Sequence, residues 1–131
     1  MDWSTKNVCA MSGNKLLVDT NILIYYFDGN LKARQLVDGN HIFVSAITVI
    51  EVLGYLRISP SEEQTIRSLL QNCQLVELTP SIRERAIRLK QTIRIKTPDA
   101  IIAASALELG LSLATGDSDF DRVPELSVVR L

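Results

Sequence analysis

The sequence predicts an α/β fold, namely a three-layer sandwich in which a central parallel sheet of about five strands has helices on both faces. Short apolar runs of strand length alternate with longer segments of helical periodicity. Strands separated by helices are typical of a parallel sheet that is covered on both sides. The length of 131 residues, with 47% apolar and 22% charged residues, indicates one compact domain.

The first part of the domain supplies two strands and two short helices. Residues 15–19 form an apolar run that ends in a carboxylate, and we expect a strand there. Residues 20–27 and 31–37 have helical character, and the Asp-Gly-Asn sequence that follows closes the second helix. The apolar run at 41–45 predicts the next strand.

The middle of the chain repeats this alternation. Residues 46–56 predict an apolar helix, and a Ser-Pro-Ser sequence at 59–61 begins another helix that continues to about residue 72. The run at 73–78 predicts a strand. Cys73 is expected in the core as a reduced thiol, because the second cysteine, Cys9, has no metal-type spacing from it.

The last part begins with a Thr-Pro-Ser helix start at residues 79–81, followed by a helical apolar stripe up to Ile93. Residues 97–108 predict a further helix, with Thr97 as its N-cap and Gly110 just after its end. The last two strands are expected at residues 111–115 and 127–131.

Residues 1–14 are polar and unpatterned, which predicts a flexible N-terminal extension before a domain at 15–131. The net charge of −1 gives no overall field that would favour nucleic acid or membrane. The first residues lack a signal-peptide pattern, and no apolar run reaches membrane-spanning length. These features predict a soluble, cytoplasmic protein.

Four acidic residues stand out because the predicted topology brings them together: Asp19, Glu51, Asp99 and Asp117. Ligand sites in parallel sheets lie outside the carboxyl ends of the strands. Carboxylates that are buried together repel one another and are costly to desolvate. A divalent ion between them would remove that cost, and carboxylate oxygens suit Mg²⁺ or Mn²⁺. The sequence therefore predicts a divalent-metal site where these four acids meet.

Each acid also has a purely structural explanation. Asp19 could cap the following helix, and Asp99 suits the first turn of any helix. Asp117 could form an Asx turn, and the nearby Asp119 and Asp121 could replace or assist it in the site. Glu51 could reach solvent or pair with an arginine, although its apolar neighbours predict a helix that is buried on most sides. A calcium loop is a weaker alternative, because its glycine and distal glutamate are absent.

Four ordered motifs together resemble the PIN domain, and most closely the VapC-type ribonuclease toxins of prokaryotic toxin–antitoxin pairs. They are Asp-Thr-Asn at residues 19–21, Ser-x-x-Thr-x-x-Glu at 45–51, Pro-Asp at 98–99 and Thr-Gly-Asp-Ser-Asp-Phe at 115–120. The resemblance covers about residues 15–131 and implies a Mg²⁺- or Mn²⁺-dependent endoribonuclease. It also implies RNA as the substrate, a homodimer, and a cognate antitoxin bound in a groove near the site.

On this resemblance, the catalytic residues are Asp19, Glu51, Asp99 and Asp117. The same four residues and Asp119 are the candidate metal ligands, with supporting hydrogen bonds expected from Asn21, Ser45, Thr48 and Thr115.

Basic residues must border an acidic site that accepts RNA. Residues 82–96 carry six basic side chains and one acid, and Arg83, Lys90 and Arg94 share one flank of the predicted helix. They are the candidate RNA-binding residues, although a solvated helix face would have the same pattern.

Two other functions also fit the sequence. One is a non-catalytic, metal-binding interaction module with a PIN-like fold. The other is a different metal-dependent phosphohydrolase in which Asp19 is a nucleophile. That chemistry normally needs a second aspartate two residues later, where this chain has Asn21.

Overall fold

The computed structural model describes residues 13–131, so that residues 1–12 of the predicted extension lie outside the described part. The elements follow in this order along the chain: β1 (Lys15–Val18), α2 (Thr20–Phe27), α3 (Leu31–Asp38), β2 (His41–Ser45), α4 (Ala46–Leu53), α5 (Pro60–Leu70), β3 (Gln74–Val76), α6 (Pro80–Thr92), α7 (Thr97–Leu109), β4 (Ser112–Thr115), the 3₁₀ helix η1 (Ser118–Arg122) and β5 (Val128–Arg130).

The described strands form one parallel sheet of five strands in the order β3-β2-β1-β4-β5. The chain builds outward from β1 to β3 on one side and then continues with β4 on the other side. The strand order therefore reverses between β1 and β4, where a ligand site is expected in a doubly wound sheet. The predicted α/β class and the sheet of about five parallel strands are confirmed.

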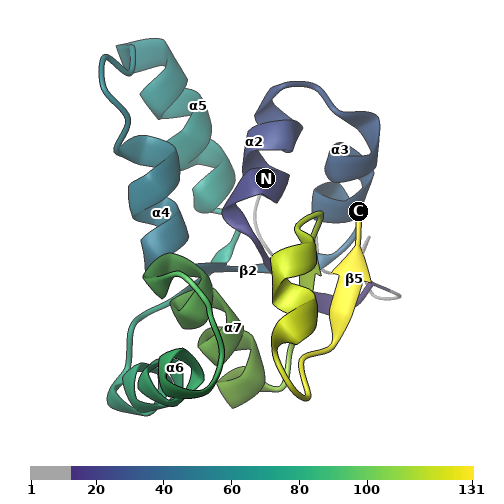
Figure 1. Ribbon diagram of the computed structural model, residues 1–131. Coiled ribbons are helices and arrows are strands. Elements are labelled where there is room, and N and C mark those ends of the chain that lie inside the picture. The colour runs from purple at the N-terminus through teal and green to yellow at the C-terminus, as the bar shows by residue number, and fades with distance from the viewer. Residues whose placement is uncertain (1–12) are drawn as a thin grey trace.

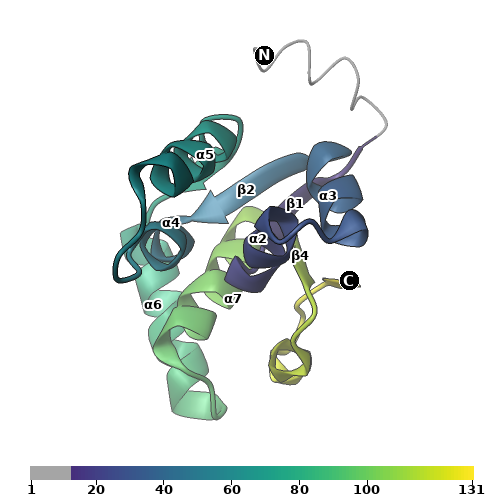
Figure 2. The same cartoon turned by 90° about the horizontal axis from the view of Figure 1, so that it is seen from above.

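Helices cover the two faces of the sheet, as Figure 1 shows with α2, α3 and α5 on one side and α6 and α7 on the other. Alternate strand residues face opposite sides, so each face has its own core. Leu17 and Leu113 pack into the core under α6 and α7. Leu16 and Val18 pack into the core under α2 to α5. Seen from above, α2 with α3 and α4 with α5 form two neighbouring pairs over the strands (Figure 2).

Several boundaries differ from the prediction. The helix expected at 46–56 ends at Leu53, followed by Gly54, where a Cβ atom would lie 2.4 Å from the carbonyl oxygen of Ile50. The strand expected at 73–78 contains only Gln74–Val76, because it is an edge strand that pairs with β2 alone. Cys73 is part-buried just before it, and its thiol contacts the Leu69 carbonyl.

The helix starts at residues 79 and 97 and the N-terminal boundary of the domain can be compared with the prediction in the same way. Thr79 caps α6 as expected, since its hydroxyl accepts a hydrogen bond from the amide of Ile82. Thr97 is the first residue of α7, and Lys96 occupies the N-cap position without a side-chain bond. Asn14, placed by the prediction in the flexible extension, joins the fold through hydrogen bonds with Asn40 and His41. Among residues 13–131, no helix is long and apolar enough to span a membrane.

Candidate functional site

Asp19 lies directly after β1 at the carboxyl edge of the sheet. Its amide donates to the carbonyl of Ala114 in β4, which places it beside the end of the neighbouring strand. The side chain is only 4% exposed and makes no capping bond to α2, although the residue occupies the N-cap position. Instead, the Thr115 hydroxyl donates to Asp19 Oδ2 over 2.9 Å. Burial raises the pKa of Asp19, and the charges of Asp117 and Glu51 act in the same direction.

Asp99 comes from the other face of the sheet, in the first turn of α7. Such a position favours the ionised carboxylate through the helix dipole. Burial nevertheless raises the pKa of Asp99 to about 6, and Asp19 and Asp117 add repulsion, as do Asp119 and Glu51. A carboxylate oxygen of Asp99 lies within 4.8 Å of carboxylate oxygens of Asp117 and Asp119, so its place in a helix start does not account for its surroundings.

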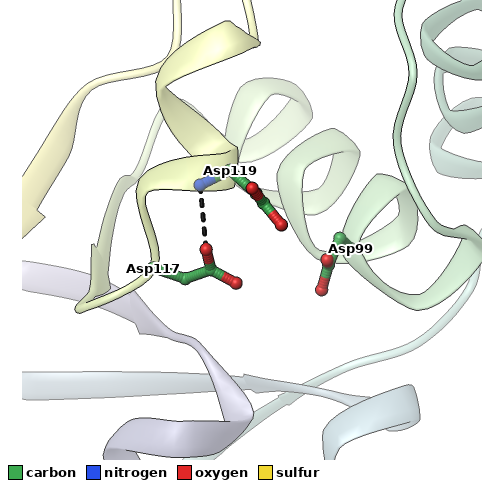
Figure 3. A group of neighbouring side chains, drawn as sticks. All are labelled: Asp99, Asp117 and Asp119. Atoms are coloured by element: carbon green, nitrogen blue, oxygen red, sulfur yellow. Dashed lines mark hydrogen bonds between the residues drawn. The ribbon is translucent and has the colours of Figure 1, made fainter.

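Asp117 and Asp119 both belong to the cluster. Asp117 Oδ1 accepts a hydrogen bond of 2.8 Å from the amide of Asp119, which is the expected Asx turn (Figure 3). Its own amide donates to the Thr115 hydroxyl over 2.9 Å. Carboxylate oxygens of Asp99, Asp117 and Asp119 lie within 4.8 Å of one another. The turn and the cluster therefore coexist, and the carboxylates of both residues lie near that of Asp99.

Glu51 reaches the site from α4 but is exposed, which corrects the expectation of a helix buried on most sides. Only Thr48 and Val52 of α4 are buried, and Ile50 is 63% exposed. The Thr20 hydroxyl donates to Glu51 Oε1 over 2.6 Å. Because a hydroxyl has one hydrogen, the 2.9 Å contact between Thr48 and Thr20 must have Thr48 as the donor. The Thr20 hydroxyl thus holds one oxygen of the exposed Glu51 carboxylate, and the Thr48 hydroxyl holds Thr20 in turn.

The other expected supporting residues have different positions. Ser45 is buried and caps α4 by accepting from the amide of Ile47 over 3.2 Å, so it acts on the helix and not on Glu51 directly. Asn21 is exposed, and within residues 13–131 no hydrogen bond joins its side chain to an acid of the cluster. Thr115 and Thr48 are the two predicted residues whose hydroxyls lead to the acids.

The three basic candidates are exposed along and just after α6. Arg83 lies 3.5 Å from Glu84. Lys90 donates to the carbonyl of Ile95 over 2.9 Å, in the loop that leads to α7. Arg94 is in that same loop, and its carbonyl accepts a hydrogen bond from Arg122. Lys90 and Arg94 therefore border the segment that leads to Asp99, whereas Arg83 lies near the far end of α6.

Sequence reasoning missed two residues at the site, Thr20 and Arg122. Thr20 lies within the Asp-Thr-Asn motif, where the sequence assigns it no role beyond starting a helix, although a hydroxyl that is buried there needs a partner. Arg122 lies three residues after Asp119, and its guanidinium donates to Asp119 Oδ1 over 2.8 Å. The three-residue spacing between Asp119 and Arg122 is the sequence signal that could have indicated this contact.

A family comparison matches residues 16–126 to the PIN domain. Among solved structures, a chain of a toxin–antitoxin complex from Klebsiella pneumoniae is 35% identical, with a TM-score of 0.77 over 87% of this chain and 95% of that one. The VapBC-1 structure from nontypeable Haemophilus influenzae is 25% identical, with a TM-score of 0.67 over 88% and 97% of the two chains.

A chain of the VapBC2 structure from Rickettsia felis, bound to a promoter DNA fragment, is 19% identical, with a TM-score of 0.73 over 88% of this chain and 98% of that one. At this identity the likeness concerns the fold alone. The comparison with curated proteins gives no match. The family match extends over most of the chain and includes every acid of the cluster. The chain therefore belongs to the PIN-domain family, whose members are nucleases, and it is similar to chains of toxin–antitoxin complexes.

Proposed function

We propose that the protein is a metal-dependent endoribonuclease and the toxin of a toxin–antitoxin pair. The observation that carries this proposal is the convergence of Asp19, Asp99, Asp117 and Asp119 at the point where the strand order reverses. Two of these acids have raised pKa values, which means that their charges are poorly compensated by the protein itself. Such an arrangement is costly unless a cation completes it.

The donor set fits a hard divalent cation. Three carboxylates within 4.8 Å of one another, next to a nearly buried fourth, supply only oxygen ligands. Within residues 13–131 no histidine or thiol belongs to this cluster, which favours Mg²⁺ or Mn²⁺ over zinc. When bound, the ion would supply the positive charge that stabilises a phosphodiester transition state and would make a water more acidic.

The protein's own residues would then have distinct roles. Asp19 and Asp99 would be the principal ligands, with Asp117 and Asp119 completing the set. Glu51 would ligate directly or through water, and its exposed carboxylate can accept a proton from an incoming water. Thr115 would keep Asp19 in one orientation, since its hydroxyl is itself fixed by the Asp117 amide.

RNA would approach across the basic residues near the site. Lys90 and Arg94 lie at the end of α6 and in the loop that leads to Asp99, where they could meet the phosphates on either side of the cleaved bond. Arg83 lies farther along the same helix and would contribute to longer-range attraction. Lys and Arg at these positions would offset the repulsion between the acidic cluster and the RNA backbone.

An antitoxin would bind in the groove of about 610 Å³ between α2, α4 and α5. Its lining combines apolar residues such as Ile24 and Val52 with the acids Asp28, Glu51 and Glu62. This surface suits a segment that has both apolar and basic side chains. Because Glu51 belongs to the groove and to the site, a partner bound there would also block the site. The likeness to a Klebsiella pneumoniae toxin–antitoxin complex supports this assignment, and homodimerisation remains part of the proposal.

The test is cleavage of structured RNA by the purified protein with Mg²⁺ or Mn²⁺. We expect cleavage that stops on adding a chelator and returns with excess metal. Asp19→Asn and Asp99→Asn should fold and lose cleavage. Asp121→Asn is the matched control, because Asp121 lies on η1 outside the cluster and pairs with Arg130. Equal cleavage by wild type and both site variants would rule out this site, and metal binding without cleavage would favour the interaction module.

A further inference from the structure

Arg122 bridges two segments that carry acids of the site. Its Nη2 donates to Asp119 Oδ1 over 2.8 Å, within η1. Its Nη1 donates over 2.9 Å to the carbonyl of Arg94, in the loop that precedes α7 and Asp99. One planar guanidinium therefore connects the segment that holds Asp119 to the segment that leads to Asp99. The rigid fork of arginine can make both bonds at once, which a single ammonium cannot do with the same geometry.

The bridge bears on the orientation of Asp119. This side chain is 48% exposed and lies among other carboxylates, so repulsion favours a rotamer that turns it away into solvent. The charge-assisted bond from Arg122 opposes that rotation, because it fixes Asp119 Oδ1 while a carboxylate oxygen of Asp119 lies close to Asp99 and Asp117.

A second arginine–aspartate pair, which joins Arg130 in β5 to Asp121 in η1, serves as an internal comparison. Arg130 donates to Asp121 Oδ1 over 2.5 Å, and its side chain is 42% exposed against 50% for Arg122. Asp121 is not a member of the carboxylate cluster. The two pairs therefore have the same chemistry and similar exposure, and they differ in whether the aspartate belongs to the site.

We propose that Arg122 is a positioning residue, which acts through Asp119 to hold the carboxylate cluster in the arrangement that binds a divalent ion. This inference rests on the proposed function only in that the cluster binds such an ion. It does not require that the protein cleave RNA.

The experiment measures Mn²⁺ affinity by calorimetric titration of chelator-stripped wild type, Arg122→Ala, Arg122→Lys and Arg130→Ala. Loss of a residue that orients a ligand typically weakens metal binding about 10- to 100-fold. We expect a loss of about tenfold or more for Arg122→Ala, a smaller loss for Arg122→Lys, and wild-type affinity for Arg130→Ala. Urea unfolding without metal should be similar for Arg122→Ala and Arg130→Ala, which separates positioning from general stability.

A double-mutant cycle tests the route of action. Because Arg122 acts through Asp119, its substitution should weaken Mn²⁺ binding much less when Asp119→Asn is already present. Undiminished or tighter Mn²⁺ binding by Arg122→Ala would overturn the proposal, as would an equal loss in Arg130→Ala or no binding by wild type. If Arg122→Ala does not fold, Arg122→Lys decides in the same way. Wild-type binding with no RNA cleavage would contradict the nuclease function and leave the role of Arg122 standing.

Discussion

The two sides of the acidic site are held in very different ways. On the side of β4 and η1, hydrogen bonds run from Asp19 through Thr115 to Asp117, then to Asp119 and Arg122. On the side of α4, Glu51 is exposed, and a single hydroxyl from Thr20 holds it. The first side is therefore a pre-organised set of acidic side chains, whereas Glu51 on the second side can adjust to whatever occupies the groove beside it.

The largest effect should come from Asp19→Asn on the rigid side. A bound metal ion stabilises the transition state of phosphodiester cleavage by several kcal/mol, so the rate of RNA cleavage should fall by about a hundredfold or more. Burial raises the pKa of Asp19, hence the ionised carboxylate destabilises the metal-free fold, and the variant should be at least as stable as wild type in urea. A variant that is inactive only because it is unfolded would not support the site.

Thr115→Val should have the next largest effect on cleavage. It keeps the shape of the buried side chain but removes the donor to Asp19 and the acceptor for the Asp117 amide. Cleavage should fall about tenfold or more, since residues that orient ligands usually have that effect. Stability should fall by about 1–3 kcal/mol, the cost of leaving buried polar groups unpaired. Thr115→Ser retains the hydroxyl and should restore most of both properties.

Thr20→Val tests the weaker side of the comparison. It removes the hydroxyl that holds Glu51. Because Glu51 is exposed, water can replace the lost bond, and cleavage should fall by less than about tenfold. Initial rates of RNA cleavage measure this. A loss as large as that of Thr115→Val would mean that the two sides are equally constrained.

The smallest effect is a pH dependence that originates at Asp99. Its folded pKa of about 6 lies above the ordinary value of 3.8, so the folded protein binds a proton first as the pH falls. In chelator, this proton uptake should stabilise wild type relative to Asp99→Asn between pH 7.5 and 5. After solvent screening of a partly exposed carboxyl, the gain should be about 1 kcal/mol. Urea unfolding at both pH values measures it, and a constant difference between the two proteins would refute the raised pKa.

The sheet and the meeting of the acids could be predicted from the sequence because both follow from regular patterns. Asp19 and Asp117 come at or just after apolar runs, and parallel strands align such ends at one edge. The exposure of Glu51 could not be predicted, because a helix with apolar neighbours on all sides does not show which face meets solvent. Ile50 and Leu56 are exposed at 63% and 86%, although both side chains are apolar.

The supporting residues depend on contacts between distant segments. The bond from Thr115 to Asp19 spans 96 residues, and the bond from Arg122 to the Arg94 carbonyl spans 28. The first was anticipated only through the family resemblance, and the second was missed. Neither leaves a periodic signal, because each rests on one side chain reaching one atom in the folded protein.

The most direct test of the central claim is Mn²⁺ titration of the chelator-stripped protein, compared with Asp99→Asn and with Asp121→Asn. If the carboxylates act as one metal site, wild type and Asp121→Asn should bind Mn²⁺ equally. Asp99→Asn should bind at least about tenfold more weakly, because it removes a ligand from the cluster. Equal binding by Asp99→Asn, or no binding by wild type, would contradict the account.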